Sequence, residues 1–87
     1  MREGVAMARS SRFRGVAGAR QVLRAIRSGR AGRVLIAEDA DPAVTGPVAQ
    51  VAREAGLPVI VVPTMRELAR RCGVEASCSC AAEPAVG

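Results

Sequence analysis

Arginine, glutamine and glycine residues near the start of the chain have the types and spacing of a phosphate-binding site. The segment holds, in chain order, Gly18, Ala19, Arg20, Gln21, Arg24 and Arg27. If a helix begins after the glycine, its free N–H groups and positive dipole end suit a phosphate. Arg20 and Arg24 then lie one turn apart, so both guanidiniums can donate to one bent phosphate backbone, while Gln21 can bind a base edge. The pattern favours a polyanion site, although an ordinary solvated helix face has the same residues.

Carboxylates form a second cluster with possible chemistry. Glu38, Asp39 and Asp41 come directly after the apolar run 33–37. Carboxylates at the end of a buried strand can hold Mg²⁺. Asp41 and Pro42 are also a preferred helix start, in which the aspartate caps the first N–H groups. We favour the cap, and expect no metal and no cofactor.

The cysteines form a third cluster, consisting of Cys72, Cys78 and Cys80. Three thiols and one outside ligand can bind Zn²⁺, but the chain has no histidine and no C-x-x-C pair. On a strand, the alternation of Cys78 and Cys80 puts both on one face, where small buried residues pack well. Packing is therefore the preferred interpretation of these thiols, and we expect them to stay reduced.

General bases are scarce in this sequence. Histidine and lysine are both absent, and the few serines and threonines lie in no nucleophile motif. A phosphoacceptor site at Asp39 would lack the lysine that such sites normally employ. We expect the protein not to be an enzyme.

Positive charge is concentrated in the first part of the chain. Residues 1–33 hold nine arginines and one acid, a net charge of +8, whereas residues 34–87 hold four arginines and seven acids, a net charge of −3. A high-GC genome would explain arginine in place of lysine but not this clustering. One cationic face for a nucleic acid is predicted. Phe13 is the only aromatic residue, which argues against recognition by stacked rings.

The elements that must position these residues alternate between helix and strand, which is typical of a layered α/β fold. A weak helix near 3–10, or a frayed arm, precedes a short strand at Phe13–Val16. An apolar stripe predicts a helix over 19–28, which Gly29 ends. The continuous apolar run 33–37 predicts a central strand buried on both faces.

The next predicted helix opens at Asp41 and runs to about Ala55. Gly46 and Pro47 lie inside its first turns, so we expect an irregular start or a true start near Pro47. Its expected core stripe consists of Val44, Val48, Val51 and Ala55.

The remainder of the chain predicts a strand, a helix and a last short strand. Prolines bracket the apolar run 59–62, which also suits a central strand buried on both faces. Thr64 and Glu67 form a capping box for a helix that ends at Gly73. The residues expected to face inward are Met65, Leu68, Ala69 and Cys72. A loop and a short strand follow.

The length suits a single domain spanning residues 1–87, with 1–12 frayed and 83–87 as a tail. No apolar run approaches the roughly 20 residues that a membrane span needs. The first residues lack the long apolar stretch of a signal peptide. We therefore expect a cytoplasmic protein, monomeric and not bound to membranes.

Three segments together resemble the kink-turn RNA-binding ribosomal protein family (the large-subunit "seven-Ae" and "thirty-e" relatives), and most of all its short bacterial members. They are residues 18–24 (GARQVLR), 36–42 (IAEDADP) and 68–75 (LARRCGVE). The resemblance implies a three-layer α/β/α sandwich with a four-stranded mixed sheet. It also implies binding to kink-turns, which are sharply bent internal loops flanked by tandem sheared G·A pairs.

The resemblance also implies roles for residues of this chain. Gly18, Ala19, Arg20, Gln21 and Arg24 would form the helix start that enters the kinked major groove, with Arg20 and Gln21 at the G·A guanines and Arg24 at a phosphate. Asp41 would lie near an extruded base. The loop over the protruding nucleotides would be Val74, Glu75 and Ala76.

One departure from the family pattern concerns the last strand, which Glu83 and Pro84 interrupt. Proline cannot donate to a central ladder, so we expect this strand to be short. The expected function is non-enzymatic binding of structured RNA, ribosomal or regulatory, by a ribosomal or ribosome-associated protein. The alternative is a protein-interaction or small-ligand module on the same sandwich fold.

Overall fold

Helices and strands alternate along the chain, as the sequence predicts. The computed structural model describes residues 15–74 and 77–85. The elements are β1 (Val16–Ala17), α2 (Ala19–Arg27), β2 (Ala31–Ala37), α3 (Pro42–Glu54), β3 (Val59–Val62), α4 (Met65–Cys72) and β4 (Cys80–Pro84). The expected helix or arm at 3–10, and the residues 13–14 of the first expected strand, lie outside the described residues.

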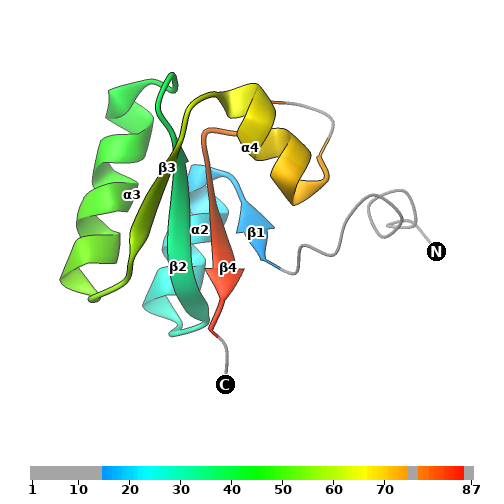
Figure 1. Ribbon diagram of the computed structural model, residues 1–87. Coiled ribbons are helices and arrows are strands. Elements are labelled where there is room, and N and C mark those ends of the chain that lie inside the picture. Colours follow the sequence, from blue (N-terminus) through cyan, green and yellow to red (C-terminus); the bar gives the residue numbers. More distant parts are fainter. Residues whose placement is uncertain (1–14, 75–76, 86–87) are drawn as a thin grey trace.

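The four strands form one mixed sheet in the order β1-β4-β2-β3. β2 and β3 are parallel, and β4 runs antiparallel to both β1 and β2. β1, β2 and β3 therefore share one direction, and each is followed by a helix (Figure 1). As a consequence, α2, α3 and α4 all begin at the same edge of the sheet, which we call the helix-start edge.

Two apolar clusters pack on opposite faces of the sheet and make the fold a three-layer sandwich. α2 and α3 cover one face, where their cluster includes Val22, Val48, Val34 and Cys80. α4 covers the other face, where Leu68 packs with Leu35, Val62 and Ala81. The mixed four-stranded sheet and the α/β/α layers confirm the predicted fold class.

The apolar run 59–62 forms the predicted strand, but its position in the sheet differs from the prediction. β3 is an edge strand, paired on one side with β2. Val61 is consequently 60% exposed. Strand order depends on contacts between distant parts of the chain, which a local apolar run does not record.

The predicted irregular start of the third helix is wrong. α3 begins at Pro42, where Asp41 caps it, and continues through Pro47. Pro47 is the sixth residue of the helix, so its missing N–H deprives only the carbonyl of Ala43 of an intrahelical donor.

The predicted core stripe of α3 is also wrong in part. The buried residues are Thr45, Val48, Ala49 and Ala52, whereas Val44 is 40% exposed. Ala55 lies beyond the helix end and is exposed. The prediction relied on large apolar residues. The face of α3 that packs against α2 and the sheet consists partly of alanines, so the prediction missed it.

The last strand is longer than expected, because β4 includes Glu83 and extends to Pro84. Pro84 lies beyond the last pairing of β4 with β1, which joins Val16 to Ala82, so no ladder bond to β1 is lost there. Gly32 is required where this segment passes, since a Cβ at that position would lie 2.6 Å from the Cα of Ala85.

In the described part of the chain, no helix has the length and apolar character needed to cross a bilayer.

Candidate nucleic-acid interface

The start of α2 is open toward solvent. Gly18 has φ 96° and ψ 145°, a conformation that favours glycine, and no side chain caps the helix there. The N–H of Gly18 donates to the carbonyl of Cys80 at 2.8 Å, and its carbonyl accepts from Val22 at 2.9 Å. The first N–H groups of the helix, beginning with that of Ala19, therefore remain available to an anion.

Three arginines extend from this start along the exposed face of α2. Arg20, Arg24 and Arg27 are exposed and line one shallow hollow together with Leu23 and Ser28. None of the three arginines forms an ion pair with another described residue. The helix dipole disfavours a cation in the first turn by about 0.3–1 kcal/mol, so Arg20 is not placed there for helix stability. Gln21 is exposed beside it.

The starts of the other two helices are occupied by side-chain caps. Asp41 accepts from the N–H of Ala43 at 2.9 Å at the start of α3. At the start of α4, Thr64 accepts from the N–H of Glu67 at 3.0 Å. Of the three described helices at the helix-start edge, α2 alone has no side-chain cap.

Asp39 makes a contact that sequence reasoning missed. Its carboxylate accepts from the N–H of Met65 at 2.8 Å and so fastens the loop after β2 to the start of α4. The two residues are 26 positions apart, and no local pattern signals such a bond. Asp39 and Asp41 are thus both capping residues. Within the described ranges, no group of three or more acids or cysteines is arranged to hold a metal ion.

The described residues around the predicted loop are divided between the start of α2 and the α4 side of the core. Because Gly18 is hydrogen bonded to Cys80, the segment before β4 lies beside that helix start. Val74 is half-buried against the α4 side of the core, and its N–H donates to the carbonyl of Ala69 at 3.0 Å. The other two predicted loop residues, Glu75 and Ala76, lie outside the described residues.

The predicted placement of two cysteines on one face is wrong. Cys78 lies before β4 and packs with Cys72 on the α4 side, whereas Cys80 packs on the opposite face of the sheet. The alternation fails because the strand begins only at Cys80. All three are buried free thiols. Burial, with a smaller contribution from Cys78, raises the pKa of Cys72 to about 12, so this thiol stays protonated.

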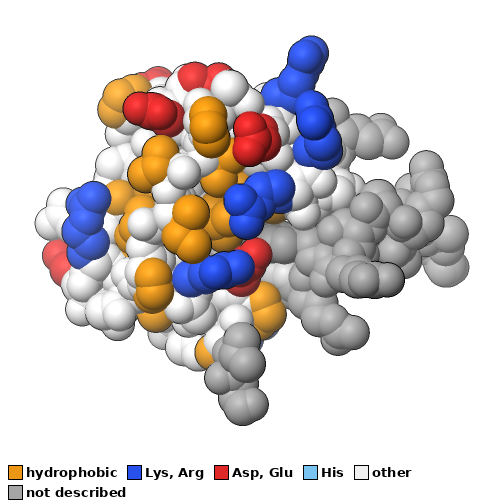
Figure 2. Space-filling view, in the orientation of Figure 1, with side chains coloured by type: hydrophobic (Ala, Val, Ile, Leu, Met, Phe, Trp, Pro, Cys, Tyr) orange, Lys and Arg blue, Asp and Glu red, His pale blue; other side chains and the backbone are white. Residues whose placement is uncertain are grey.

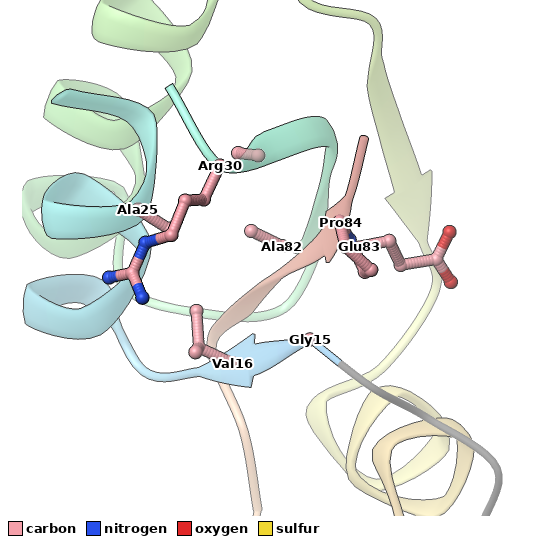
Figure 3. Close-up of a pocket in the computed structure, with 8 residues that line it drawn as sticks. Gly15, Val16, Ala25, Arg30, Ala82, Glu83 and Pro84 are labelled. Carbon is pink, nitrogen blue, oxygen red and sulfur yellow. The ribbon is translucent and has the colours of Figure 1, made fainter. Parts of the chain in front are cut away.

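A second hollow lies at the opposite end of α2 and differs in character (Figure 3). Small apolar residues, including Ala25, Ala31 and Ala82, line most of it. Arg30 turns its guanidinium toward α2 and donates to the hydroxyl of Ser28 at 2.9 Å. Glu83 points away from Arg30 and pairs with Arg33 on the other face of the sheet, which raises the pKa of that arginine.

Known proteins of similar sequence belong to one family of RNA-binding and ribosomal proteins. The model of the "Ribosomal protein L7Ae/L30e/S12e/Gadd45 family" matches residues 3–87. An RNA-binding protein of Geobacillus sp. strain WCH70 is 40% identical over 60 residues, which cover 69% of this chain and 73% of the relative. RNA-binding protein YbxF of Geobacillus stearothermophilus is 38% identical over the same shares.

Solved structures share the fold. The 15.5 kDa RNA binding protein of Giardia lamblia superimposes with a TM-score of 0.75 and is 27% identical, covering 80% of this chain. This chain spans 59% of the length of that protein. A protein of unknown function from Bacillus halodurans has a TM-score of 0.72 and 22% identity, and shows the fold alone.

Proposed function

The chain belongs to the ribosomal protein L7Ae/L30e/S12e/Gadd45 family, and on that basis we propose that it binds structured RNA, with kink-turns as its preferred motif. Its relatives of similar length are RNA-binding proteins, so it is a binding protein and not an enzyme. We further propose that it acts as a monomeric cytoplasmic component or associate of the ribosome.

The observation that carries the proposal is the start of α2. It combines N–H groups without a side-chain cap, a glycine that permits close approach, and arginines without ion pairs among the described residues. The starts of α3 and α4 lack this combination because side chains already cap them. A phosphate backbone therefore meets its best partner at α2.

A kinked RNA suits this surface better than a regular duplex does. The major groove of an RNA duplex is too deep and narrow for side chains to read, but a kink opens it. We propose that Arg20 and Gln21 bind base edges of the G·A pairs inside the opened groove. Arg24 and Arg27, which lie further along α2, would bind the phosphates that the bend brings together.

Two further parts of the proposed site are assigned from the family resemblance. Asp41 is exposed at the helix-start edge, although one carboxylate oxygen caps α3, so the other can face an extruded base. Val74, Glu75 and Ala76 would cover the protruding nucleotides. These assignments follow the family resemblance, together with the position of the segment before β4 beside Gly18.

A gel-shift titration at physiological salt tests the proposal. The wild-type chain is titrated with a standard kink-turn duplex and with a duplex whose G·A pairs are replaced. Arg20→Ala is expected to weaken kink-turn binding by about 5- to 150-fold, which corresponds to 1–3 kcal/mol for a base contact. Arg24→Ala is expected to weaken binding to all RNAs and to lower the salt slope by about 1.

Arg53→Ala is the matched control, because Arg53 is an exposed arginine in the last turn of α3, away from the helix-start edge. It removes the same charge and should leave kink-turn binding nearly unchanged. Equal, weak binding of wild type to both duplexes would overturn the kink-turn proposal and favour a protein-interaction module. Wild-type affinity in both α2 variants would show that the RNA-binding surface lies elsewhere.

A further inference from the structure

α4 carries a second set of exposed arginines, separate from those on α2. Arg66, Arg70 and Arg71 are all exposed on this helix of eight residues. Figure 2 shows basic side chains projecting from the part of the surface that α4 occupies in Figure 1. No ion pair joins Arg66 or Arg70 to any residue in the described part of the chain. The two guanidiniums are thus free to bind an external anion.

The arginines of α4 repeat the placement of those on α2. Arg66 and Arg70 are the second and sixth residues of α4, and Arg20 and Arg24 are the second and sixth residues of α2. Both helices begin at the helix-start edge but cover opposite faces of the sheet. One pair of arginines therefore stands on each flank of this edge.

Helix stability does not explain Arg66. A cation in the first turn is unfavourable with respect to the helix dipole, and two N–H groups of that turn, those of Met65 and Glu67, are already capped by Asp39 and Thr64. The guanidiniums are therefore the principal donors for an anion at this flank. This differs from the start of α2, where backbone N–H groups are also available.

The edge between the two pairs is acidic. Glu38, Asp39 and Asp41 are exposed in the loop after β2, and Figure 2 shows acidic side chains along the same border of the molecule. A phosphate backbone is repelled from this centre and attracted to both flanks. Because opposite charges are separated in this way, the surface suits a bent RNA whose two arms descend on either side.

We propose that Arg66 and Arg70 bind the phosphate backbone of one helical arm of the RNA whose kink is held at the start of α2. This inference rests on the proposed function and extends its surface to the opposite layer of the sandwich. The contact is electrostatic and independent of sequence, so it adds affinity and fixes the direction of the arm without reading bases.

The test uses three kink-turn RNAs: one with two long flanking helices, and two in which one or the other helix is cut short. The double variant Arg66→Gln/Arg70→Gln is compared with wild type by gel shift at several salt concentrations. On the long RNA, the variant should bind about tenfold more weakly, and its salt slope should be lower by about 2, near 0.9 for each lost phosphate contact. Shortening one particular arm should abolish the difference.

Two controls separate this inference from the proposed function. Arg53→Gln removes an exposed charge outside both pairs and should bind all three RNAs like wild type. A thermal melt should show that the double variant is folded. If the double variant matches wild type in affinity and salt slope while Arg20→Ala still loses binding, the inference is wrong, the proposed function stands, and α4 becomes a candidate protein contact. If wild type itself does not discriminate kink-turns, both proposals fail together.

Discussion

Gly18 and Gly46 differ in backbone conformation but both have room for a side chain, so replacing each by alanine isolates the effect of conformation on stability. At both positions, a Cβ would have no heavy atom within 4 Å. Gly18 has a positive φ of 96°, whereas Gly46 lies in the helical conformation of α3. We predict that Gly18→Ala lowers the free energy of unfolding by about 1–3 kcal/mol, because an L residue is strained there. Urea unfolding measures this loss.

Gly46→Ala is the matched control and should have the opposite sign. It should raise the free energy of unfolding by about 0.5–1 kcal/mol, since alanine loses less backbone freedom in a helix than glycine does. Equal effects of the two substitutions would contradict the conformation assigned to Gly18, and with it the close approach of an RNA backbone to this residue.

Cys72 predicts a pH dependence of stability. Its pKa is raised from the ordinary 9.0 to about 12 in the folded protein, so the native state holds this proton more tightly than the unfolded chain does. The stabilisation is complete below pH 9 and is lost as the pH rises toward 12. The free energy of unfolding should therefore fall across this range.

The comparison with Cys72→Ala isolates this contribution. The variant has no thiol to titrate at this position, so its stability deficit relative to wild type should shrink as the pH rises above 9. Urea titrations at a series of pH values measure the deficit. A deficit that stays constant across the series would show that the thiol is not desolvated.

At the scale of elements, α4 depends on a residue from another part of the chain. Asp39 accepts from the N–H of Met65, the first residue of α4. We predict that Asp39→Ala lowers the free energy of unfolding by about 1 kcal/mol, the usual cost of losing a helix cap. Asp39→Asn keeps an acceptor oxygen and should cost less.

Glu38→Ala provides the comparison, because Glu38 is an exposed neighbour whose carboxylate makes no hydrogen bond to a described residue. It should change stability by less than about 0.5 kcal/mol. A cost for Glu38→Ala as large as that for Asp39→Ala would mean that the loop charge, and not the cap, stabilises this region.

Helix ends were predictable wherever the signal was local. Thr64 caps α4 and Gly73 ends it in the left-handed conformation, as predicted, although only the Thr64 half of the capping box forms a hydrogen bond among the described residues. The start of α3 was not predicted correctly. Whether the helix can contain Pro47 depends on the turn that this residue occupies, and that turn depends on where the cap fixes the first residue of the helix. The buried face of α3 was also missed, since its alanines gain their burial from tertiary packing.

At the scale of the whole molecule, the alternation of helix and strand was sufficient to predict a layered α/β fold, whereas the three layers and the mixed sheet were predicted from the family resemblance. The order of the strands was not predictable from short apolar runs, so the sequence did not indicate that β3 is an edge strand. Of the predicted site residues in α2, Arg20 and Gln21 are exposed at the helix-start edge, and Arg24 and Arg27 are exposed further along the helix, whereas Ala19 is half-buried. The sequence did not indicate that the arginines of α4 belong to the same surface, because only the crossover connections of the sheet bring α4 to that edge.

The common start of the three helices at one edge has a kinetic consequence. Their positive dipole ends point the same way, and the arginines of α2 and α4 begin at that edge. The acids of the loop after β2 oppose this field at the centre of the edge, so a polyanion is drawn toward the two flanks of the edge before any contact forms. A diffusing RNA would then meet the arginines of one flank first. Salt would slow the encounter itself, and not only loosen the complex.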